Sequence, residues 1–406
     1  MAVKIVRQPK KIALIGAPTS AAALQGGHER APAALRAAGL IERLQAVGYE
    51  VADLGDCAPQ LYQPDDEHPR ARNLPAILAA LNDLKPRVEQ AVKSGALPLV
   101  LGGDCVIALA TLAGVRRYYR NVSLIWMDRD ADLNVPATTP SGCVDGMVVA
   151  HVIGRGAPEL VRFWGGPPLV REPDIALFGV DRLDPPEGVL LARSPIRRYL
   201  AADVRRQGAA AAAEAALERV HAGSHEFVLH LDVDVISADD FRATNFAASG
   251  GLQLDDVRQA LAVFTRQKNL IAMEVAVYNP ELDPDGSGAK LLIDLVASAL
   301  AERLVALAGA EAPAATAAVE TVASPAVEAS AADVAALPAA PAEAESPAVN
   351  ASSSATSTAV VEPAPEAVEP ETPAASAAEP SPSEAAPETG ESAGPETPSE
   401  SETSGS

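Results

Sequence analysis

Two groups of aspartates follow two apolar segments of the chain. Asp128, Asp130 and Asp132 come directly after one apolar run, and Asp232 and Asp234 come directly after another. Short apolar runs of this kind predict buried strands. Because strand side chains alternate between faces, acids two residues apart point the same way if the extended geometry continues. We therefore expect carboxylates to gather at two strand ends.

Carboxylates gathered in this way need a positive partner. Hard oxygen ligands favour magnesium, calcium or manganese. The first group does not fit an EF-hand calcium loop, because Leu133 and Thr139 occupy the positions that need Gly and Glu. Helix caps or solvated turns explain one such group equally well. Two groups on two buried strands favour a cation site.

Cys105 and Glu274 are further candidates beside these acids. The segment Gly102-Gly103-Asp104-Cys105 also ends an apolar run. Taken alone, it fits a glycine turn with a small buried cysteine, whereas beside five carboxylates Cys105 becomes a candidate thiolate ligand. Glu274, at the end of another apolar run, needs an ionic partner or a cation. The histidines show no ligand spacing and are typical of surface or core positions: His28, His68, His151, His221, His225 and His230.

Apolar runs alternate with helical patterns over the first three quarters of the chain. We expect strands at 11–16, 49–54, 97–101, 124–127, 174–178, 227–231 and 270–275. We expect helices at 32–47, 75–94 with a kink or break at Pro86, 106–119, 209–222 and 289–307. This order predicts an α/β fold with three αβα layers, a mainly parallel sheet and helices on both faces. In such sheets the ligand site lies beyond the carboxyl ends of the strands, where the acids converge.

The last part of the chain has a different composition. After Arg303 there are 17 acidic residues and no Lys, Arg or His, in a background of Ala, Pro, Ser and Thr. Such a segment has too little large apolar surface to offset its conformational entropy. We expect a folded domain at 1–308 and a disordered acidic tail at 309–406. Without the tail the net charge of −22 becomes −5, which gives no support to nucleic acid as a partner.

Cysteine usage and hydropathy indicate the location. The three cysteines, Cys57, Cys105 and Cys143, are an odd number and lie far apart in sequence, unlike a disulfide framework. The first residues contain no apolar stretch of signal-peptide length. No apolar run reaches the length of about 18 residues that a membrane span needs. We expect a cytoplasmic protein that does not enter the membrane.

The order of these segments resembles the ureohydrolases, the family of arginase, agmatinase and formiminoglutamase. The family pattern Gly-Gly-Asp-His is matched by residues 102–105, Asp-Ala-His-x-Asp by 128–132, and Asp-x-Asp by 232–234. The substrate loop Ser-Gly-Asn-Leu-His-Gly is matched by residues 141–146, and Glu-Val-Asn-Pro only at Asn279-Pro280. The resemblance covers about residues 11–304 and implies the arginase-like fold.

The resemblance also implies a binuclear manganese hydrolase that cleaves a guanidino or amidino C–N bond and releases urea. Two Mn(II) ions are expected. One would be held by Cys105, Asp128, Asp132 and Asp232, and the other by Asp128, Asp130, Asp232 and Asp234. A water deprotonated by the metals would attack the guanidinium carbon. The family forms trimers or hexamers, so a homo-oligomer is expected.

Further roles carry over by position. Asp132 would take up a proton, and Asp145 stands where the family has its proton-shuttling His. Glu274 would orient the guanidinium if it reaches in from a position three residues early, since Val277 stands where the family has Glu. The amino-acid end of the substrate would contact Asn134, Ser141 and Asp184.

The chain departs from the family where histidines are expected. Cys105, Asp130 and Asp145 stand at three histidine positions. Cysteine at the first position resembles a branch that includes hydroxyarginine amidinohydrolases, so a modified arginine is a candidate substrate. One alternative is a degenerate ureohydrolase that binds or has a structural role without catalysis. A second is a nucleotide-sugar transferase that uses Asp232-Val233-Asp234 as a metal–diphosphate clamp, which leaves residues 128–132 unexplained.

Overall fold

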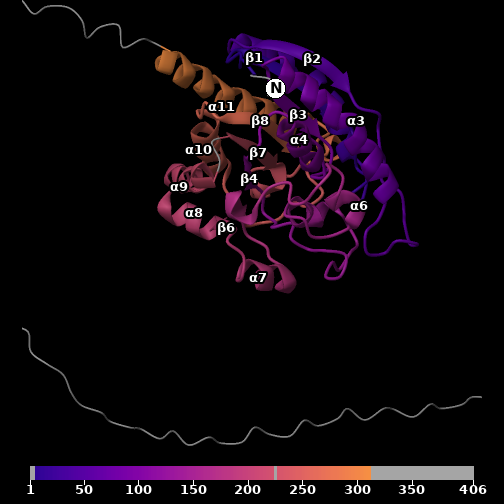
Figure 1. The fold of residues 1–406 in the computed structure, drawn as a ribbon. Coiled ribbons are helices and arrows are strands. Elements are labelled where there is room, and N and C mark those ends of the chain that lie inside the picture. Colours follow the sequence, from indigo (N-terminus) through magenta and orange to yellow (C-terminus); the bar gives the residue numbers. More distant parts are fainter. Residues whose placement is uncertain (1–4, 224–225, 312–406) are drawn as a thin grey trace, which may run out of the picture. The chain divides into compact units, whose positions relative to one another are not determined.

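An eight-stranded sheet forms the centre of the protein (Figure 1). The computed structural model describes residues 5–223 and 226–311. Every neighbouring pair of strands is parallel, in the order β2-β1-β3-β8-β7-β4-β5-β6. The strands are β1 (Lys11–Ala17), β2 (Glu50–Asp56), β3 (Leu97–Gly102), β4 (Val122–Met127), β5 (Ile175–Val180), β6 (Arg197–Leu200), β7 (Glu226–Asp232) and β8 (Leu270–Ala276).

Helices connect the strands and cover the sheet. They are α1 (Ala31–Ala37), α2 (Leu40–Ala46), α3 (Leu74–Lys93), α4 (Ile107–Arg116), α5 (Val148–Val152), α6 (Pro158–Val161), α7 (Pro185–Leu191), α8 (Ala201–Gln207), α9 (Ala209–Gly223), α10 (Leu254–Thr265) and α11 (Ser287–Glu311). None of the described helices is both long and apolar enough to cross a membrane.

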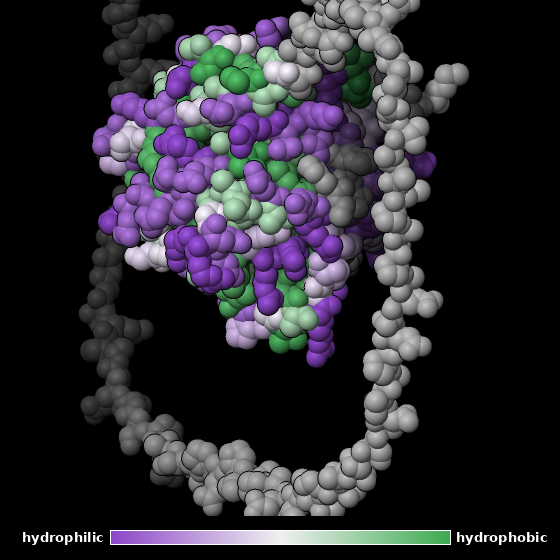
Figure 2. Space-filling model, turned by 90° about the vertical axis from the view of Figure 1, so that its left-hand side faces the viewer, coloured by the Kyte–Doolittle hydropathy of each residue, from purple (hydrophilic) through white to green (hydrophobic). Residues whose placement is uncertain are grey.

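Two hydrophobic cores lie on opposite faces of the sheet. One packs α1, α2 and α8–α11 against the sheet, and the other packs α3–α5 against it (Figure 1). Strands β3, β4, β5 and β8 are buried at every residue, which explains their continuous apolar sequences. The three-layer α/β prediction is therefore confirmed. On the face in Figure 2, hydrophilic side chains surround separate hydrophobic patches.

Three local predictions were wrong. The helix expected at 32–47 is two helices, because Gly39 adopts φ 94 between α1 and α2. Helix α3 continues through Pro86 without a break; the carbonyl that loses its partner belongs to the exposed Asn82. Strand β6 was missed because it is a four-residue edge strand that begins with two exposed arginines.

The C-terminal end of the described fold differs from the expected boundary. Helix α11 runs to Glu311, so the predicted boundary at 308 falls within it. The predicted tail from 312 onwards lies outside the described residues, as does His225, and both interpretations stay predictions.

A buried histidine makes the fold sensitive to acid. In α5, His151 is 2% exposed; its Nδ1–H donates to the Met147 carbonyl (2.7 Å) and its Nε2 accepts from the Ala157 N–H (3.0 Å). Burial lowers the pKa of His151 from 6.5 to about 4. Because the unfolded chain then binds the proton more readily, the stability present above pH 6.5 is lost as pH falls toward 4.

We expect H151Q to lose less stability on acidification than the wild type. A glutamine can donate and accept in the same place without titrating, so the loss between pH 7.5 and pH 5 should shrink by about 2 kcal/mol. Urea unfolding at both pH values measures this difference. H68Q, at an exposed histidine, is the control and should follow the wild type. Equal acid sensitivity of H151Q and the wild type would contradict the assignment.

Candidate metal centre

A small cavity of about 110 Å³ opens at the carboxyl edge of the sheet. Its lining contains ten of the residues that the sequence singled out: Cys105, Asp128, Asp130, Asp132, Asn134, Ser141, Asp145, Asp184, Asp232 and Asp234. These come from the ends of β3, β4 and β7 and from the loops that follow β4 and β5, and Cys105 and Asp232 are 127 residues apart in the sequence. The eleventh, Glu274, is not among the described residues that line the cavity.

The first aspartate group converges through a turn and not through strand alternation. Strand β4 ends at Met127, and the Asp130 N–H then donates to Asp128 Oδ1 (2.7 Å). Asp132 has φ 51, in the left-handed region that residues other than glycine rarely adopt. The expected extended geometry across 128–132 is therefore wrong. Backbone strain of this kind is common where a side chain must be aimed at a functional site.

The second group and the cysteine meet across the cavity. The Asp234 N–H donates to Asp232 Oδ1 (2.8 Å) as the chain enters a 3₁₀ turn after β7. The Cys105 thiol donates to Asp232 Oδ2 (3.0 Å), and the Cys105 N–H donates to Asp145 Oδ1 (2.7 Å). Gly103 lets this loop approach closely, since a Cβ there would lie 2.0 Å from the Thr19 carbonyl oxygen.

Crowding raises the pKa values of the buried acids. Burial, followed by neighbouring carboxylates, raises the pKa of Asp128 and Asp232 well above the usual range. Burial and the charge of Asp130 raise the pKa of Asp234 to about 7. Burial also raises the pKa values of Asp132 and Cys105. Without a cation these groups must take up protons, so a bound cation would stabilise them in their ionised form.

Two sets of donor atoms are arranged closely enough to hold metal ions. Asp128, Asp130 and Asp234 form one set; Cys105, Asp128, His230 and Asp232 form the other. Within each set the ligand atoms lie within 4.8 Å of one another. Asp128 belongs to both sets, and Asp234 Oδ1 has no hydrogen-bond partner within the described part of the chain. The donor set therefore fits two neighbouring cations that share Asp128.

Two members of this arrangement differ from expectation. Asp132 lines the cavity but belongs to neither set, so its role as a ligand stays a prediction. His230 was interpreted as an ordinary histidine, yet it joins one set. The sequence did contain the signal: His230 lies two residues before Asp232 in the same strand, so both side chains project from one face.

Arg182 provides a positive charge that the sequence did not predict. Its guanidinium donates two hydrogen bonds to Asp130, from Nε to Oδ1 (2.5 Å) and from Nη2 to Oδ2 (2.8 Å). Arg129, which lies between Asp128 and Asp130 in the sequence, donates to the Phe246 carbonyl (3.0 Å). The set of Asp128, Asp130 and Asp234 thus contains an aspartate whose two oxygens already contact a guanidinium.

The predicted substrate residues form one wall of the cavity. The Asn134 amide donates to Asp184 Oδ2 (2.8 Å), and Ser141 lies on the adjoining loop. Asp184 also caps α7, where Glu187 completes a capping box. Glu187 Oε1 accepts from the Leu133 N–H (2.8 Å), which ties this wall to the loop after β4.

Glu274 has a different place from the one expected. It is fully buried in β8, and its Oε2 lies 2.8 Å from Nδ1 of His230 on the neighbouring strand. Since it is not among the described residues that line the cavity, the orientation of a guanidinium by Glu274 stays a prediction. Val277, at the position of the family's Glu, is also buried and carries no charge.

Comparisons with known proteins agree with this architecture. A model of the arginase family matches residues 10–301. The arginase of Bacillus caldovelox is 33% identical over 300 residues, which cover 73% of this chain and 100% of that protein. The chain belongs to the arginase family. Solved structures similar to this chain include the arginase of B. caldovelox, at 32% identity and TM-score 0.68, over 72% of this chain and 98% of that one. They also include a Bacillus cereus arginase, at 30% identity and TM-score 0.66, over 72% of this chain and 98% of that one.

These similarities confirm the recognised family and fold. They support a hydrolase that acts on C–N bonds of linear amidines. The formimidoylglutamase of Bacillus subtilis, at 17% identity and TM-score 0.59, supports the fold alone.

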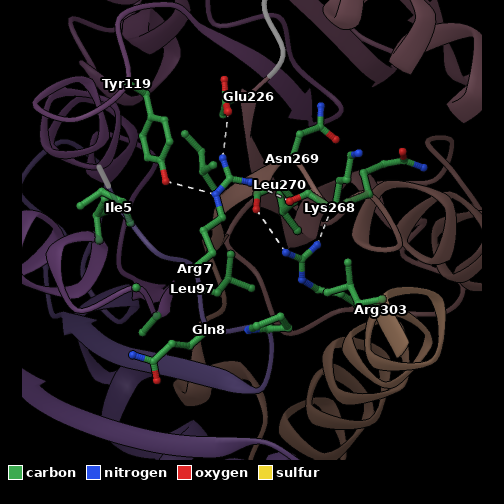
Figure 3. A pocket seen from close by; sticks show the side chains of 17 residues that line it. Ile5, Arg7, Gln8, Leu97, Tyr119, Glu226, Lys268, Asn269, Leu270 and Arg303 are labelled. Atoms are coloured by element: carbon green, nitrogen blue, oxygen red, sulfur yellow. Dashed lines mark hydrogen bonds and ion pairs between the residues drawn. The ribbon is translucent and has the colours of Figure 1, made fainter. Parts of the chain in front are cut away.

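A larger cavity of about 870 Å³ lies at the opposite, amino-terminal edge of the sheet (Figure 3). Its polar side chains are engaged with one another: Arg7 donates to Tyr119 Oη (3.2 Å) and to Glu226 Oε1 (2.9 Å). Arg303 donates to the carbonyls of Thr265 and Gln267. These contacts join the first residues to β7, and α11 to the end of α10 and the turn that follows it, so the polar groups here hold the fold together.

We expect D128N to stabilise the metal-free arginase family member and to weaken its response to metal. An amide removes one charge from the crowded site, which should raise the free energy of unfolding by about 1 kcal/mol or more at pH 7.5. Because Asp128 belongs to both donor sets, the rise in melting temperature on adding manganese should fall.

Thermal unfolding with chelator and with manganese measures both effects. D66N changes the charge equally at an exposed site and is the control. A D128N protein that is less stable without metal, yet gains as much from manganese as the wild type, would contradict the role of charge crowding.

Proposed function

We propose that this protein hydrolyses a guanidino or amidino C–N bond with the help of two manganese ions, as an arginase-like, urea-releasing enzyme. One observation carries the proposal: two donor sets that share Asp128 lie at the carboxyl edge of the sheet, in a member of the arginase family. When bound, a metal pair supplies a deprotonated water at neutral pH and stabilises developing negative charge. The metal ligands we propose are Cys105, Asp128, Asp130, Asp132, Asp232 and Asp234.

The chain's own residues would bind the substrate and move protons. Asp132 and Asp145 both line the cavity beside the donor sets. A carboxylate there can accept a proton from the attacking water and later deliver one to the leaving amine. Asp145 is held in place by the Cys105 N–H, so its position is coupled to that of the proposed ligand.

The wall formed by Asn134, Ser141 and Asp184 would receive the other end of the substrate. The amide and hydroxyl groups can hydrogen-bond an amino-acid end, and Asp184 can bind an amino group. The cavity volume of about 110 Å³ favours a small compound. Family membership and the acids at 128–132 favour hydrolysis over the nucleotide-sugar transferase alternative.

We expect the full-length protein, after incubation with manganese and desalting, to retain about two ions per chain by elemental analysis. It should then release urea from at least one compound in a panel of arginine, hydroxylated arginine, agmatine and other guanidino acids. D132N should lower that rate by about 100-fold or more, because it removes a proton acceptor. D66N should leave the rate unchanged. A metal content near zero would overturn the proposal.

A second candidate is a family member that binds without catalysis. The ion pair between Arg182 and Asp130 favours it, because the guanidinium competes with a cation for both oxygens of that carboxylate. The buried Val277 at the position of the family's Glu favours it too. In this case the set of Asp128, Asp130 and Asp234 would bind manganese only weakly, and no urea would be released.

We expect R182Q to bind the second manganese more tightly than the wild type. The change frees Asp130 and removes a positive charge near the site, and both effects favour a cation. Isothermal titration calorimetry with manganese measures the affinity for the second ion. R155Q breaks the Arg155–Glu172 surface ion pair and is the matched control. Unchanged second-ion affinity in R182Q would show that Arg182 does not compete.

The assembly and location remain part of the proposal. We infer a homo-oligomer, trimeric or hexameric as the family resemblance implies, and a cytoplasmic location. The proposed partner is a small guanidino or amidino substrate.

A further inference from the structure

His230 lies in the interior of the sheet's α3–α5 face, directly below the cavity. It is fully buried in β7, between Trp126 on β4 and Glu274 on β8. Its ring stacks on the Trp126 ring, with centroids 3.7 Å apart and planes 5° apart. The packing on both sides fixes the ring in one orientation.

The two ring nitrogens of His230 have different surroundings. Nδ1 contacts Glu274 Oε2 at 2.8 Å. When Nδ1 donates to this carboxylate, Nε2 keeps its lone pair. Nε2 has no hydrogen-bond partner among the described residues, although it is fully buried. An unpaired buried acceptor of this kind is costly unless something binds it.

His151 shows how a core histidine is satisfied in the same protein. It is 2% exposed, and both its nitrogens have backbone partners, at 2.7 and 3.0 Å. His230 lacks the second partner, and one of its ring nitrogens lies within 4.8 Å of Cys105 Sγ and of carboxylate oxygens from Asp128 and Asp232. Since Nδ1 contacts Glu274, Nε2 is the ring nitrogen left to bind a cation at this set.

We propose that His230 is a direct ligand of the cation held by Cys105, Asp128 and Asp232, and that Glu274 positions its ring. This inference rests on the proposed metal-dependent function. A carboxylate that accepts from the other ring nitrogen of a ligating histidine is a common arrangement around metals, because it fixes the tautomer and raises ligand basicity. Glu274 therefore acts on the site through His230.

This donor set differs from the one that the family pattern implies. Sulfur, imidazole nitrogen and two carboxylates form a set that zinc and cobalt bind well, whereas Asp128, Asp130 and Asp234 offer oxygen only. His230 in β7 would thus provide the imidazole ligand that the family pattern has at position 105. Cobalt(II) is then a suitable probe, because a thiolate ligand gives it a near-ultraviolet charge-transfer band; Cys105 must release its proton on binding.

The test uses the full-length protein labelled with ¹⁵N at histidine and loaded with manganese. Pulsed electron paramagnetic resonance should detect a directly bound ¹⁵N. The coupling should be absent in H230F, which keeps a ring against Trp126 but has no nitrogen. H230F should bind cobalt about 100-fold more weakly than the wild type, and E274Q about tenfold more weakly. H151Q, at another buried histidine, should retain both the coupling and the affinity.

The outcomes separate the two levels of the proposal. A wild-type protein that takes up neither manganese nor cobalt would contradict the metal-dependent function itself. A loaded wild type without ¹⁵N coupling would leave that function standing and overturn the role of His230. If H230F does not fold, the wild-type spectrum and E274Q still decide. Unchanged cobalt affinity in E274Q, with a lower melting temperature, would make Glu274 a core partner only.

Discussion

The repulsion between buried carboxylates at the carboxyl edge of the sheet is the constraint on which the site depends. Asp128, Asp232 and Asp234 are each at most 4% exposed, and burial together with their mutual charge raises their pKa values. Backbone N–H groups donated by residues 130 and 234 offset part of this cost. The rest requires protons or cations. A protein that needed only stability would not place these groups together.

The two ends of the sheet have divided roles. At the amino-terminal end, Arg7 donates to the Lys268 carbonyl and to Glu226, and Arg303 donates to the Thr265 carbonyl, beside the larger cavity. At the carboxyl end, Asp234 Oδ1 and His230 Nε2 have no partners within the described residues. Size alone would have pointed to the wrong end, whereas unsatisfied polar atoms indicate where a ligand belongs.

The altered histidine positions have consequences in the neighbouring residues. Asp130 meets the guanidinium of Arg182, and Cys105 lies beside a histidine that arrives from the middle of a strand. Glu274 is three residues early for a substrate contact but directly opposite His230 in the β7–β8 register. The departures from the family pattern are therefore connected through space: the charge and donor type change together around the two metal sets.

Periodicity and motif order in the sequence determined the layers, seven of the eight strands and ten residues of the cavity. Buried parallel strands have continuous apolar sequences, and chemistry on such a sheet lies at the carboxyl ends, so Asp128–Asp132 and Asp232–Asp234 could be placed without coordinates. The edge strand β6 and the break at Gly39 depend on exposure and a backbone angle that the pattern did not reveal. Only the tertiary structure paired Arg182 with Asp130 and His230 with Glu274. The physical reason is that these pairs join residues 52 and 44 positions apart, and strand register and loop paths, which local sequence does not encode, decide which side chains meet.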